Sequence, residues 1–302
     1  MKIGRAAWLT DTGRRRTRNE DAYVFEPPLF AIADGMGGAR AGEVAAGIAA
    51  AALRDGRREV IDEASLEASI EEANRRVWER SVADPTTAGM GTTVTVALVD
   101  GAEAEIVFGH VGDSRAYRLR GDVLEQITTD HSLVAELIES GVLTPEEAER
   151  HPQRSAITRA VGTESAIEVD VFRVPAELGD LVLLCSDGLT DMLSEDEIAS
   201  ALLVADRDPE AAAERLVAAA NARGGEDNIT VVLFELVEGE PEPVTVDDLP
   251  ATDGGMSEAT LADPEADVSR HGAGSGGRLA ALALVALVVV VGVLALYWGI
   301  SR

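Results

Sequence analysis

The sequence has 302 residues, of which 46% are hydrophobic but only 4% aromatic, so its core must be built from Ala, Val, Leu and Ile. Its formal net charge of −28 argues against nucleic-acid binding, which favours a basic surface. Lys2 is the only lysine. The sequence therefore excludes a P-loop enzyme, a protein kinase and a pyridoxal enzyme, each of which needs a lysine in its site.

The first part of the chain alternates segments typical of strands and helices. Its opening run, MKIGRAAWLTDTGRRR, has too short an apolar stretch for a signal peptide. We expect helices at 41–54, 64–81, 131–140, 195–205 and 209–222, and strands at 92–99, 104–111, 114–120 and 228–236. Capping-box patterns at 144–147 (TPEE) and 194–197 (SEDE) mark two helix starts.

The connections between these segments indicate how they are arranged. Strands that follow one another through short turns favour antiparallel sheets, and long helical segments between strand groups favour helices on the outer faces. The run GDSR between 104–111 and 114–120 predicts a tight hairpin. We therefore expect an α+β fold that forms one globular unit over residues 1–236.

The composition changes after this unit. Residues 237–277 are rich in Asp, Glu, Pro, Gly and Ser and lack aromatic residues. Such a segment cannot bury enough apolar surface to fold, and its like charges repel each other. We expect an acidic, disordered linker.

An uncharged segment follows the linker, from Leu279 to Trp298. At ~1.5 Å per residue it can span the ~30 Å hydrocarbon core of a bilayer. We therefore predict a transmembrane helix at 278–299. Arg270 and Arg278 precede it and Arg302 follows it, so the positive-inside rule predicts a single-pass cell-membrane protein with a cytoplasmic N-terminal domain.

Three acidic residues stand out by their position beside apolar strands. Asp34 follows the run FAIA, Asp187 follows LVLLCS, and Asp227 precedes NITVVLFEL. Carboxylates gathered at strand ends lose hydration and repel one another unless a cation neutralises them. Hard divalent cations prefer such oxygen ligands, so the sequence predicts a metal-dependent enzyme.

Eight motifs, in order along residues 1–236, resemble the PPM (type 2C) metal-dependent Ser/Thr protein phosphatases in their bacterial membrane-anchored form. They are RTRNED (16–21), ADGMGG (33–38), GTT (91–93), GHVGDSR (109–115), DHS (130–132), HPQRSAITRAVG (151–162), CSDGLTD (185–191) and EDNIT (226–230). The resemblance implies a four-layer α-β-β-α sandwich of two antiparallel sheets with flanking helices. It also implies that residues 131–160 form a flap beside the active site.

The same resemblance implies a two-metal mechanism that uses Mn²⁺ or Mg²⁺, with a third, weaker ion possible. Its implied assignments are Asp34 as a bridge between two ions, the Gly35 carbonyl on one of them, Asp187 and Asp227 on the second, Glu20 and Asp21 through metal-bound waters, Asp113 at the third ion, and Arg16 on the substrate phosphate. The two ions would activate a bridging water for in-line attack on phosphoserine or phosphothreonine. Membrane Ser/Thr kinases and their substrates are the implied partners.

One motif position differs from many eukaryotic members. Met36 stands where those carry the histidine proposed as the leaving-group acid. His131, His151 or a metal-bound water could take that role, although a structural role is expected for each lone histidine.

Several alternatives remain beside this interpretation. The Gly-rich turn after Asp34 has Arg40 at the third glycine position of a dinucleotide-binding fingerprint, which argues against that fold. A catalytically inactive binding module would be expected to lose ligands that are all present here, and an active enzyme could instead act on an anti-sigma pathway.

Cys185 should be a buried core thiol, because a Cys-dependent phosphatase needs Arg where this chain has Asp191. Arg14, Arg15 and Arg18 could form a solvated basic loop or attract phosphorylated peptides.

Overall fold

The computed structural model describes residues 1–37, 41–56, 62–148 and 151–240. The chain divides into two compact units, Met1–Leu249 and Pro250–Arg302, and all described residues belong to the first. The predicted linker beyond residue 240 and the predicted membrane span at 278–299 lie outside the described residues. No helix within the described ranges is both long and apolar enough to cross a bilayer.

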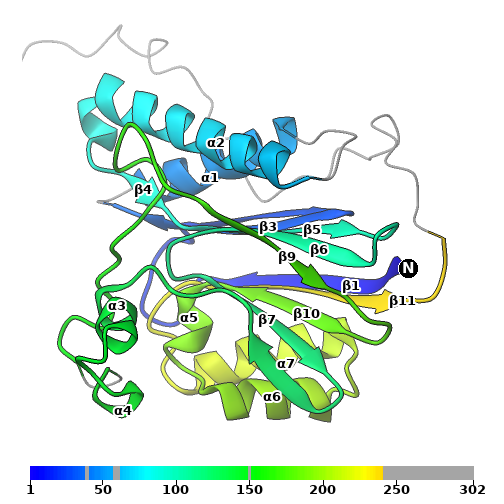
Figure 1. The fold of residues 1–302 in the computed structure, drawn as a ribbon. Coiled ribbons are helices and arrows are strands. Elements are labelled where there is room, and N and C mark those ends of the chain that lie inside the picture. Colours follow the sequence, from blue (N-terminus) through cyan, green and yellow to red (C-terminus); the bar gives the residue numbers. More distant parts are fainter. Residues whose placement is uncertain (38–40, 57–61, 149–150, 241–302) are drawn as a thin grey trace, which may run out of the picture. The chain divides into compact units, whose positions relative to one another are not determined.

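Two antiparallel sheets lie face to face with helices on both outer surfaces (Figure 1). One sheet has the order β1-β11-β10-β7-β8 and the other β2-β3-β5-β6-β9, with β4 paired to β3. The strands are β1 (Lys2–Asp11), β2 (Asp21–Glu26), β3 (Leu29–Met36), β4 (Gly91–Thr92), β5 (Val94–Asp100), β6 (Glu105–Val111), β7 (Arg115–Arg120), β8 (Val123–Gln126), β9 (Asp170–Pro175), β10 (Leu181–Cys185) and β11 (Ile229–Val237).

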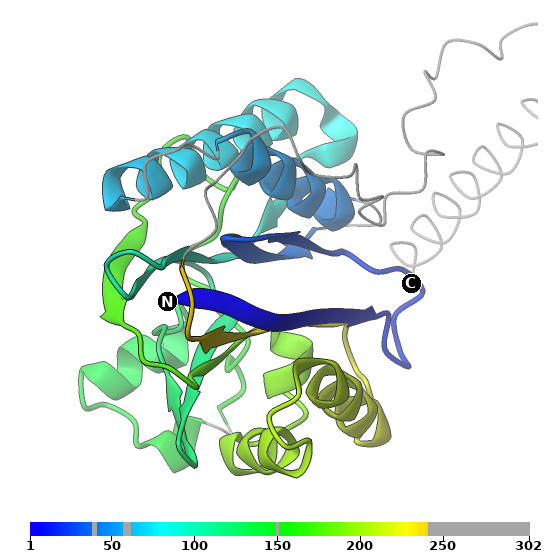
Figure 2. The same cartoon turned by 90° about the vertical axis from the view of Figure 1, so that its right-hand side faces the viewer.

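Helices α1 and α2 cover the β3 sheet, and α6 and α7 cover the β11 sheet (Figures 1 and 2). The helical elements are α1 (Ala41–Asp55), α2 (Glu63–Ala83), η1 (Pro85–Thr87), α3 (Leu133–Glu139), α4 (Pro145–Ala148), α5 (Asp187–Thr190), α6 (Glu195–Val204) and α7 (Pro209–Ala222). This confirms the predicted α-β-β-α layers.

The central strands are apolar on both faces because each face is covered. In β10, Leu181, Leu183 and Cys185 pack against α6 and α7, whereas Val182 and Leu184 face the other sheet. Period-2 alternation places successive side chains on opposite faces of a strand. Cys185 is fully buried, which confirms the predicted core thiol, and burial raises its pKa to about 12.

Aromatic side chains join the two sheets at their interface. Phe30 of β3 stacks on Phe234 of β11 with ring centroids 4.3 Å apart, and both side chains are fully buried. Offset stacking of this kind adds to the apolar contact that holds two sheets together. The interface therefore fixes how the two sheets lie relative to each other.

The predicted helices and capping boxes are confirmed with small shifts in their bounds. Thr144 and Glu147 exchange hydrogen bonds at the start of α4, and the Ser194 N–H donates to Glu197 at the start of α6. The predicted helix at 131–140 is shorter, because Ser132 caps it by accepting the Ala135 N–H and α3 begins at Leu133.

The predicted hairpin at GDSR is wrong. β6 and β7 lie in different sheets, so residues 112–114 carry the chain from one sheet to the other. Gly112 has a φ of +111°, and a Cβ there would lie 2.6 Å from the Thr93 side chain. Both the turn conformation and the space at Thr93 require glycine. The alternation of side chains along the strands could not predict this crossover. Two consecutive strands show the same period whether they lie in one sheet or in two.

Candidate metal centre and active site

Five aspartates from both sheets converge at one end of the sandwich. Asp21 on β2 and Asp34 on β3 pair directly opposite each other. Asp187 is the first residue of α5, immediately after β10, and Asp227 lies just before β11. Asp113 lies on the crossover between the sheets. β3 extends beyond Asp34 to Met36, so the strand does not stop at the Asp–Gly pair as expected.

These carboxyl groups share one electrostatic environment. Burial raises the pKa of Asp34 well above its ordinary range, and the charges of Asp21, Asp187 and Asp113 raise it further. Burial and the charges of Asp113, Asp191 and Asp227 do the same to the pKa of Asp187. Each group therefore disfavours ionisation of the others, as expected for buried like charges without a cation.

Asp113 and Asp21 show the same effect with different partners. Burial and the charge of Asp130 raise the pKa of Asp113 to about 7. Burial also raises the pKa of Asp21 to about 6, although hydrogen bonds from Thr230 and Ser186 oppose the shift. The Thr230 and Ser186 hydroxyls donate to Asp21 Oδ2 over 2.6 and 2.9 Å. The Asp21 carboxyl is thereby held toward the β11 sheet, although it belongs to the other one.

The cluster contains buried oxygens that have no partner. Oδ1 of Asp21, Oδ1 of Asp113 and Oδ1 of Asp187 are inaccessible and accept no hydrogen bond within the described structure. A buried acceptor without a donor is costly, and a cation would satisfy it. No three His, Cys, Asp or Glu side chains in the described ranges are already arranged around one point as ligands. The carboxylate and carbonyl oxygens gathered here are nevertheless the donors that a hard divalent cation prefers.

A close backbone contact brings α1 against the end of β3. A Cβ on Gly35 would lie 2.2 Å from the Gly42 carbonyl oxygen, and a Cβ on Gly42 would lie 2.5 Å from Glu20 Oε2. Only glycine at both positions permits this approach. It places the Gly35 backbone and the Glu20 carboxylate side by side at the edge of the cluster.

Arg16 approaches the cluster from the connection between β1 and β2. Its Nη2 lies 2.6 Å from Asp227 Oδ2, and half of its side chain is exposed. Burial lowers the pKa of the Arg16 guanidinium, but the charge and hydrogen bond of Asp227, together with the charges of Glu20 and Asp34, outweigh burial and raise it. The guanidinium therefore remains charged beside the carboxylates, with N–H groups still directed to solvent.

The buried side chain of Asn228 holds this connection in place. Its Nδ2 donates to the carbonyl oxygens of Thr12 and Arg18 over 3.0 and 2.8 Å, and its Oδ1 accepts the Glu20 N–H over 2.7 Å. Asn228 thus fixes both ends of the segment that carries Arg16. The sequence analysis missed this role, although its position directly after Asp227 could have indicated it.

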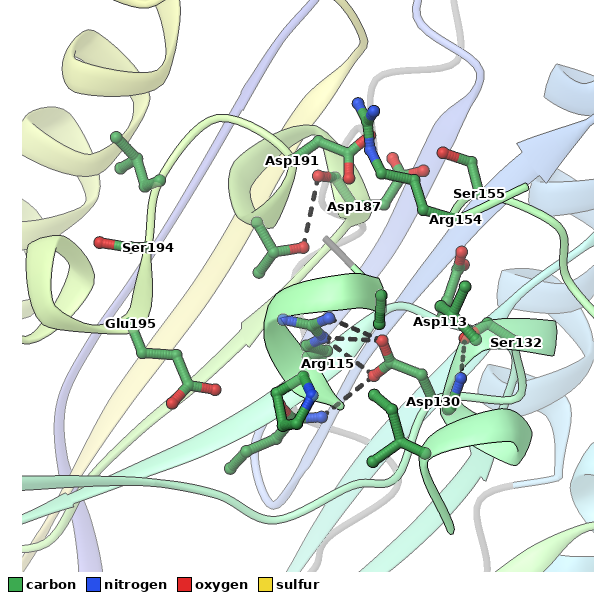
Figure 3. A pocket seen from close by; sticks show the side chains of 18 of the residues that line it. Asp113, Arg115, Asp130, Ser132, Arg154, Ser155, Asp187, Asp191, Ser194 and Glu195 are labelled. Atoms are coloured by element: carbon green, nitrogen blue, oxygen red, sulfur yellow. Dashed lines mark hydrogen bonds and ion pairs between the residues drawn. The ribbon is translucent and has the colours of Figure 1, made fainter. Parts of the chain in front are cut away.

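A pocket of about 810 Å³ opens beside the cluster, between α3–α4 and α5–α6. Asp113, Asp187, Asp191 and Arg154 line this pocket (Figure 3). Arg115 and Asp130 form a bidentate ion pair in its wall, with Nη2 and Oδ2 2.7 Å apart. The sequence analysis assigned no role to this pair, to Asp191 or to Arg154.

The two candidate histidines have local partners. His131 Nδ1 accepts the Gly112 N–H over 3.1 Å, and Nε2 lies 3.2 Å from Asp170 Oδ2. His131 thus ties the segment before α3 to the crossover, and burial lowers its pKa. His151 Nδ1 accepts the Gln153 N–H within its own turn. Met36 belongs to the end of β3, where it pairs with Gly91.

Comparison with known proteins gives the family. A profile described as protein phosphatase 2C matches residues 13–220. The serine/threonine phosphatase stp of Listeria innocua is 42% identical over 242 residues, which cover 76% of this chain and 95% of that protein.

Two solved structures support the same grouping. The Mycobacterium tuberculosis serine/threonine phosphatase PstP/Ppp superposes with a TM-score of 0.74 at 40% identity, over 78% of this chain and all of the other. A catalytic domain of PstP in complex with two manganese ions superposes with a TM-score of 0.71 at 38% identity, over 78% and 99% of the two chains. The chain therefore belongs to the protein phosphatase 2C family of serine/threonine protein phosphatases.

Proposed function

We propose that the unit formed by residues 1–236 hydrolyses phosphoserine and phosphothreonine in proteins with two Mn²⁺ or Mg²⁺ ions as cofactors. The observation that carries this proposal is the carboxylate cluster, in which Asp21, Asp113 and Asp187 each hold a buried oxygen without a partner beside Asp34. Carboxylate and carbonyl oxygens favour these hard cations over zinc. The two manganese ions in the PstP relative support the same cofactor.

The proposed ligands follow the positions of the donors. Asp34 would bridge the two ions, with the Gly35 carbonyl on one of them, and Asp187 and Asp227 would bind the second. Glu20 and Asp21 would act through water, and Asp113 would help to hold a third, weaker ion. When bound, the ions would supply an activated water for in-line attack and neutralise charge on the phosphoryl group.

Arg16 is proposed to bind the substrate phosphate. Its Nη2 is used by Asp227, so the remaining N–H groups of the guanidinium are available for phosphate oxygens. A planar guanidinium can donate two hydrogen bonds at once to a phosphate, and the pair with Asp227 orients it for this. Asn228 maintains this arrangement through the backbone of the segment that carries Arg16.

The substrate side of the reaction is proposed to use the pocket in Figure 3. The scissile phosphate would lie at Asp113 and Asp187, and the polypeptide that carries it would lie between the flap and α5–α6. An open pocket of this size accommodates an extended peptide segment, which agrees with a protein substrate.

We also propose that residues 278–299 anchor the enzyme in the cell membrane, with the catalytic unit cytoplasmic and near membrane Ser/Thr kinases. The support is the uncharged run from Leu279 to Trp298 and the arginines before it. The acidic linker would be repelled by anionic lipid and would hold the catalytic unit away from the surface. Protease treatment of intact cells tests this arrangement, and cleavage of the catalytic unit from outside would overturn it.

The activity is tested with the purified full chain and Mn²⁺. Release of phosphate from an aryl phosphate and from a phosphothreonine peptide is expected, with loss in a chelator and recovery when Mn²⁺ is restored. Absence of phosphate release from both substrates in the presence of Mn²⁺ would refute the proposed function.

A further inference from the structure

Three exposed arginines near Arg16 lack close partners. Arg14, Arg15 and Arg18 are exposed, and none forms an ion pair or a side-chain hydrogen bond within the described part of the chain. Arg18 exerts only a longer-range attraction on Glu20, whose pKa it lowers against the effect of burial. Three positive charges are thus left available to solvent on one short segment.

This arrangement is unusual for a protein with a net charge of −28. Other arginines are neutralised by nearby acids, such as Arg75 by Glu72 and Arg120 by Asp180. With so many carboxylates on the surface, three neighbouring unpaired arginines form a local positive patch. We call Arg14, Arg15 and Arg18 the basic loop.

The backbone of the basic loop is held firmly. The N–H groups of Arg14 and Arg15 both donate to the Gly225 carbonyl, over 2.7 and 3.2 Å. The Arg18 carbonyl accepts from Asn228, as described above. Part of the entropic cost of ordering a binding loop is therefore already met in the free protein, which favours its use as a recognition element.

The basic loop also lies beside the proposed phosphate site. Arg14, Arg15 and Arg18 are within two residues of Arg16, whose side chain reaches Asp227. Consecutive Cα atoms are about 3.8 Å apart, so the loop arginines lie within reach of residues that neighbour a bound phosphoresidue. The connection between β1 and β2 projects from the end of the sandwich, where a peptide can reach it (Figure 2).

We propose that the basic loop binds negative charge next to the phosphorylated residue of the substrate, either a carboxylate or a second phosphoryl group. This inference rests on the proposed phosphatase activity and adds a substrate class to it. Acidic or multiply phosphorylated segments become the preferred substrates, because their additional charge is matched by Arg14, Arg15 and Arg18 and is otherwise repelled by the acidic surface.

The experiment compares matched phosphothreonine peptides with the full chain and Mn²⁺. The residues that flank phosphothreonine are Gln, Glu, Lys or a non-hydrolysable phosphonate analogue of phosphoserine. We expect kcat/KM to rise about fivefold or more from Gln to Glu flanks, as one or more exposed ion pairs would give. If kcat/KM rises more with the phosphonate than with Glu, a second phosphoryl group is the preferred source of negative charge. If the two rises in kcat/KM are equal, the loop recognises negative charge whatever group carries it.

The variant R14Q/R15Q/R18Q keeps most of each side chain but removes the charges, so it should lose the ratio between Glu and Gln peptides. R215Q is the matched control, because Arg215 is also exposed and unpaired within the described structure but lies on α7. It should keep the ratio. Salt near 1 M should reduce the ratio in the wild type, since screening then acts within about 3 Å.

The possible results distinguish failure of the basic-loop inference from failure of the proposed function. If no phosphopeptide is hydrolysed, both fail. If all peptides are hydrolysed with equal kcat/KM, or the triple variant keeps the wild-type ratio, only the basic-loop inference is overturned. It is also overturned if the triple variant instead loses binding to phosphatidylserine vesicles while the peptide ratio stays the same, because the loop would then bind lipid.

Discussion

Asp21 and Asp34 lie directly opposite each other on β2 and β3, with both side chains partly buried among further acids. Like charges directly opposite across a strand pair destabilise a sheet. The protein keeps this pair at the end of the sandwich where Asp113, Asp187 and Asp227 also converge. This pairing indicates that, at the proposed metal-binding end of the fold, stability is given up for function.

The stability of the metal-free protein should fall as pH rises from 6.5 to 8. The pKa of Asp113 is raised to about 7, and that of Asp34 is raised well above its ordinary range of about 4. For a raised carboxyl pKa, the stabilising contribution is complete below the unfolded value and is lost as pH rises through the folded value. Thermal unfolding in a chelator measures the change. Mn²⁺ should restore stability, and more at pH 8 than at pH 6.5.

A variant separates this effect from other titrations. Asp113→Asn removes one of the titrating carboxyls, so its Tm in chelator should depend less on pH over the same window. The buried His110 acts in the opposite direction, because burial lowers its pKa to about 4 and stability therefore rises with pH up to the unfolded value of about 6.5, the lower edge of the window. Both proteins contain His110, so the comparison of Asp113→Asn with the wild type cancels this contribution. A Tm in chelator that is constant or rises with pH in the wild type would contradict the assignment of repulsive carboxylates.

Asp187→Asn should abolish most activity while the fold persists. The substitution keeps the shape of the side chain but removes the charge of a proposed metal ligand, so kcat/KM should fall at least about 100-fold, as for loss of a major electrostatic contribution. The Tm in chelator should stay equal or rise, since a repulsive charge is removed. Phosphate release and thermal unfolding measure the two effects.

Asp122→Asn is the matched control for Asp187→Asn. Asp122 is largely exposed and, among the residues that the structure describes, pairs only with Arg207, so this variant should match the wild type in both measurements. Full turnover by Asp187→Asn would place the second metal elsewhere.

Arg16→Lys should raise KM for phosphopeptides more than it lowers kcat. Lysine keeps the charge but loses the planar fork, so one charge-assisted hydrogen bond of about 1.5–3 kcal/mol is lost, which corresponds to about 10- to 100-fold in kcat/KM. Steady-state kinetics with a phosphothreonine peptide measure the split. An unchanged kcat/KM would show that Arg16 does not bind the phosphate.

Asn228→Asp should produce a similar kinetic defect although Asn228 is not proposed to contact substrate. The change replaces the Nδ2 donor to Thr12 and Arg18 with an oxygen that repels both carbonyls. The segment that carries Arg16 then loses its position, so KM should rise. In combination with Arg16→Lys, the two effects should be strongly non-additive, because both act on the same contact. Additive effects would show that Asn228 acts on stability alone.

Gly112→Ala should destabilise the protein by about 2–4 kcal/mol, because alanine adds strain at positive φ and a Cβ too close to Thr93. Gly121→Ala is the control, since Gly121 also has a positive φ of +55° but open space around a Cβ. It should cost only about 1–2 kcal/mol. Denaturant unfolding measures both, and equal losses would contradict the steric role of Thr93.

The sequence predicted much of the fold because each element carries a local signal. The helix starts at Ser194 and Thr144 depend on side chains three residues apart, and the strand at 228–236 depends on a continuous apolar run. The crossover at Gly112 was predicted as a hairpin, because the choice of sheet depends on contacts with Thr93 that are distant in sequence. Long-range pairing is the part that periodicity does not encode.

The candidate site could likewise be predicted from the sequence only in part. The positions of Asp187 and Asp227 beside strand ends could be identified from neighbouring apolar residues, whereas β3 continues past Asp34 to Met36. The motifs supplied roles for the other residues. The hydrogen bonds that Ser186 and Thr230 make to Asp21, and the one from Asn228 to Arg18, join residues 165 to 210 positions apart. Only the folded structure shows that these polar residues support the proposed ligands and not a turn on the surface.

The stacking of Phe30 on Phe234 has a consequence for the choice of metal. Asp34 follows Phe30 on one sheet, and Asp227 precedes Phe234 on the other, so the thickness of the apolar interior sets the span between carboxylates from opposite sheets. If Asp34 and Asp227 bind the metal as proposed, ionic radius and interior volume are linked in this fold. A lineage adapting to a smaller or larger ion could do so by repacking side chains that never contact the metal, and its ligands would stay the same.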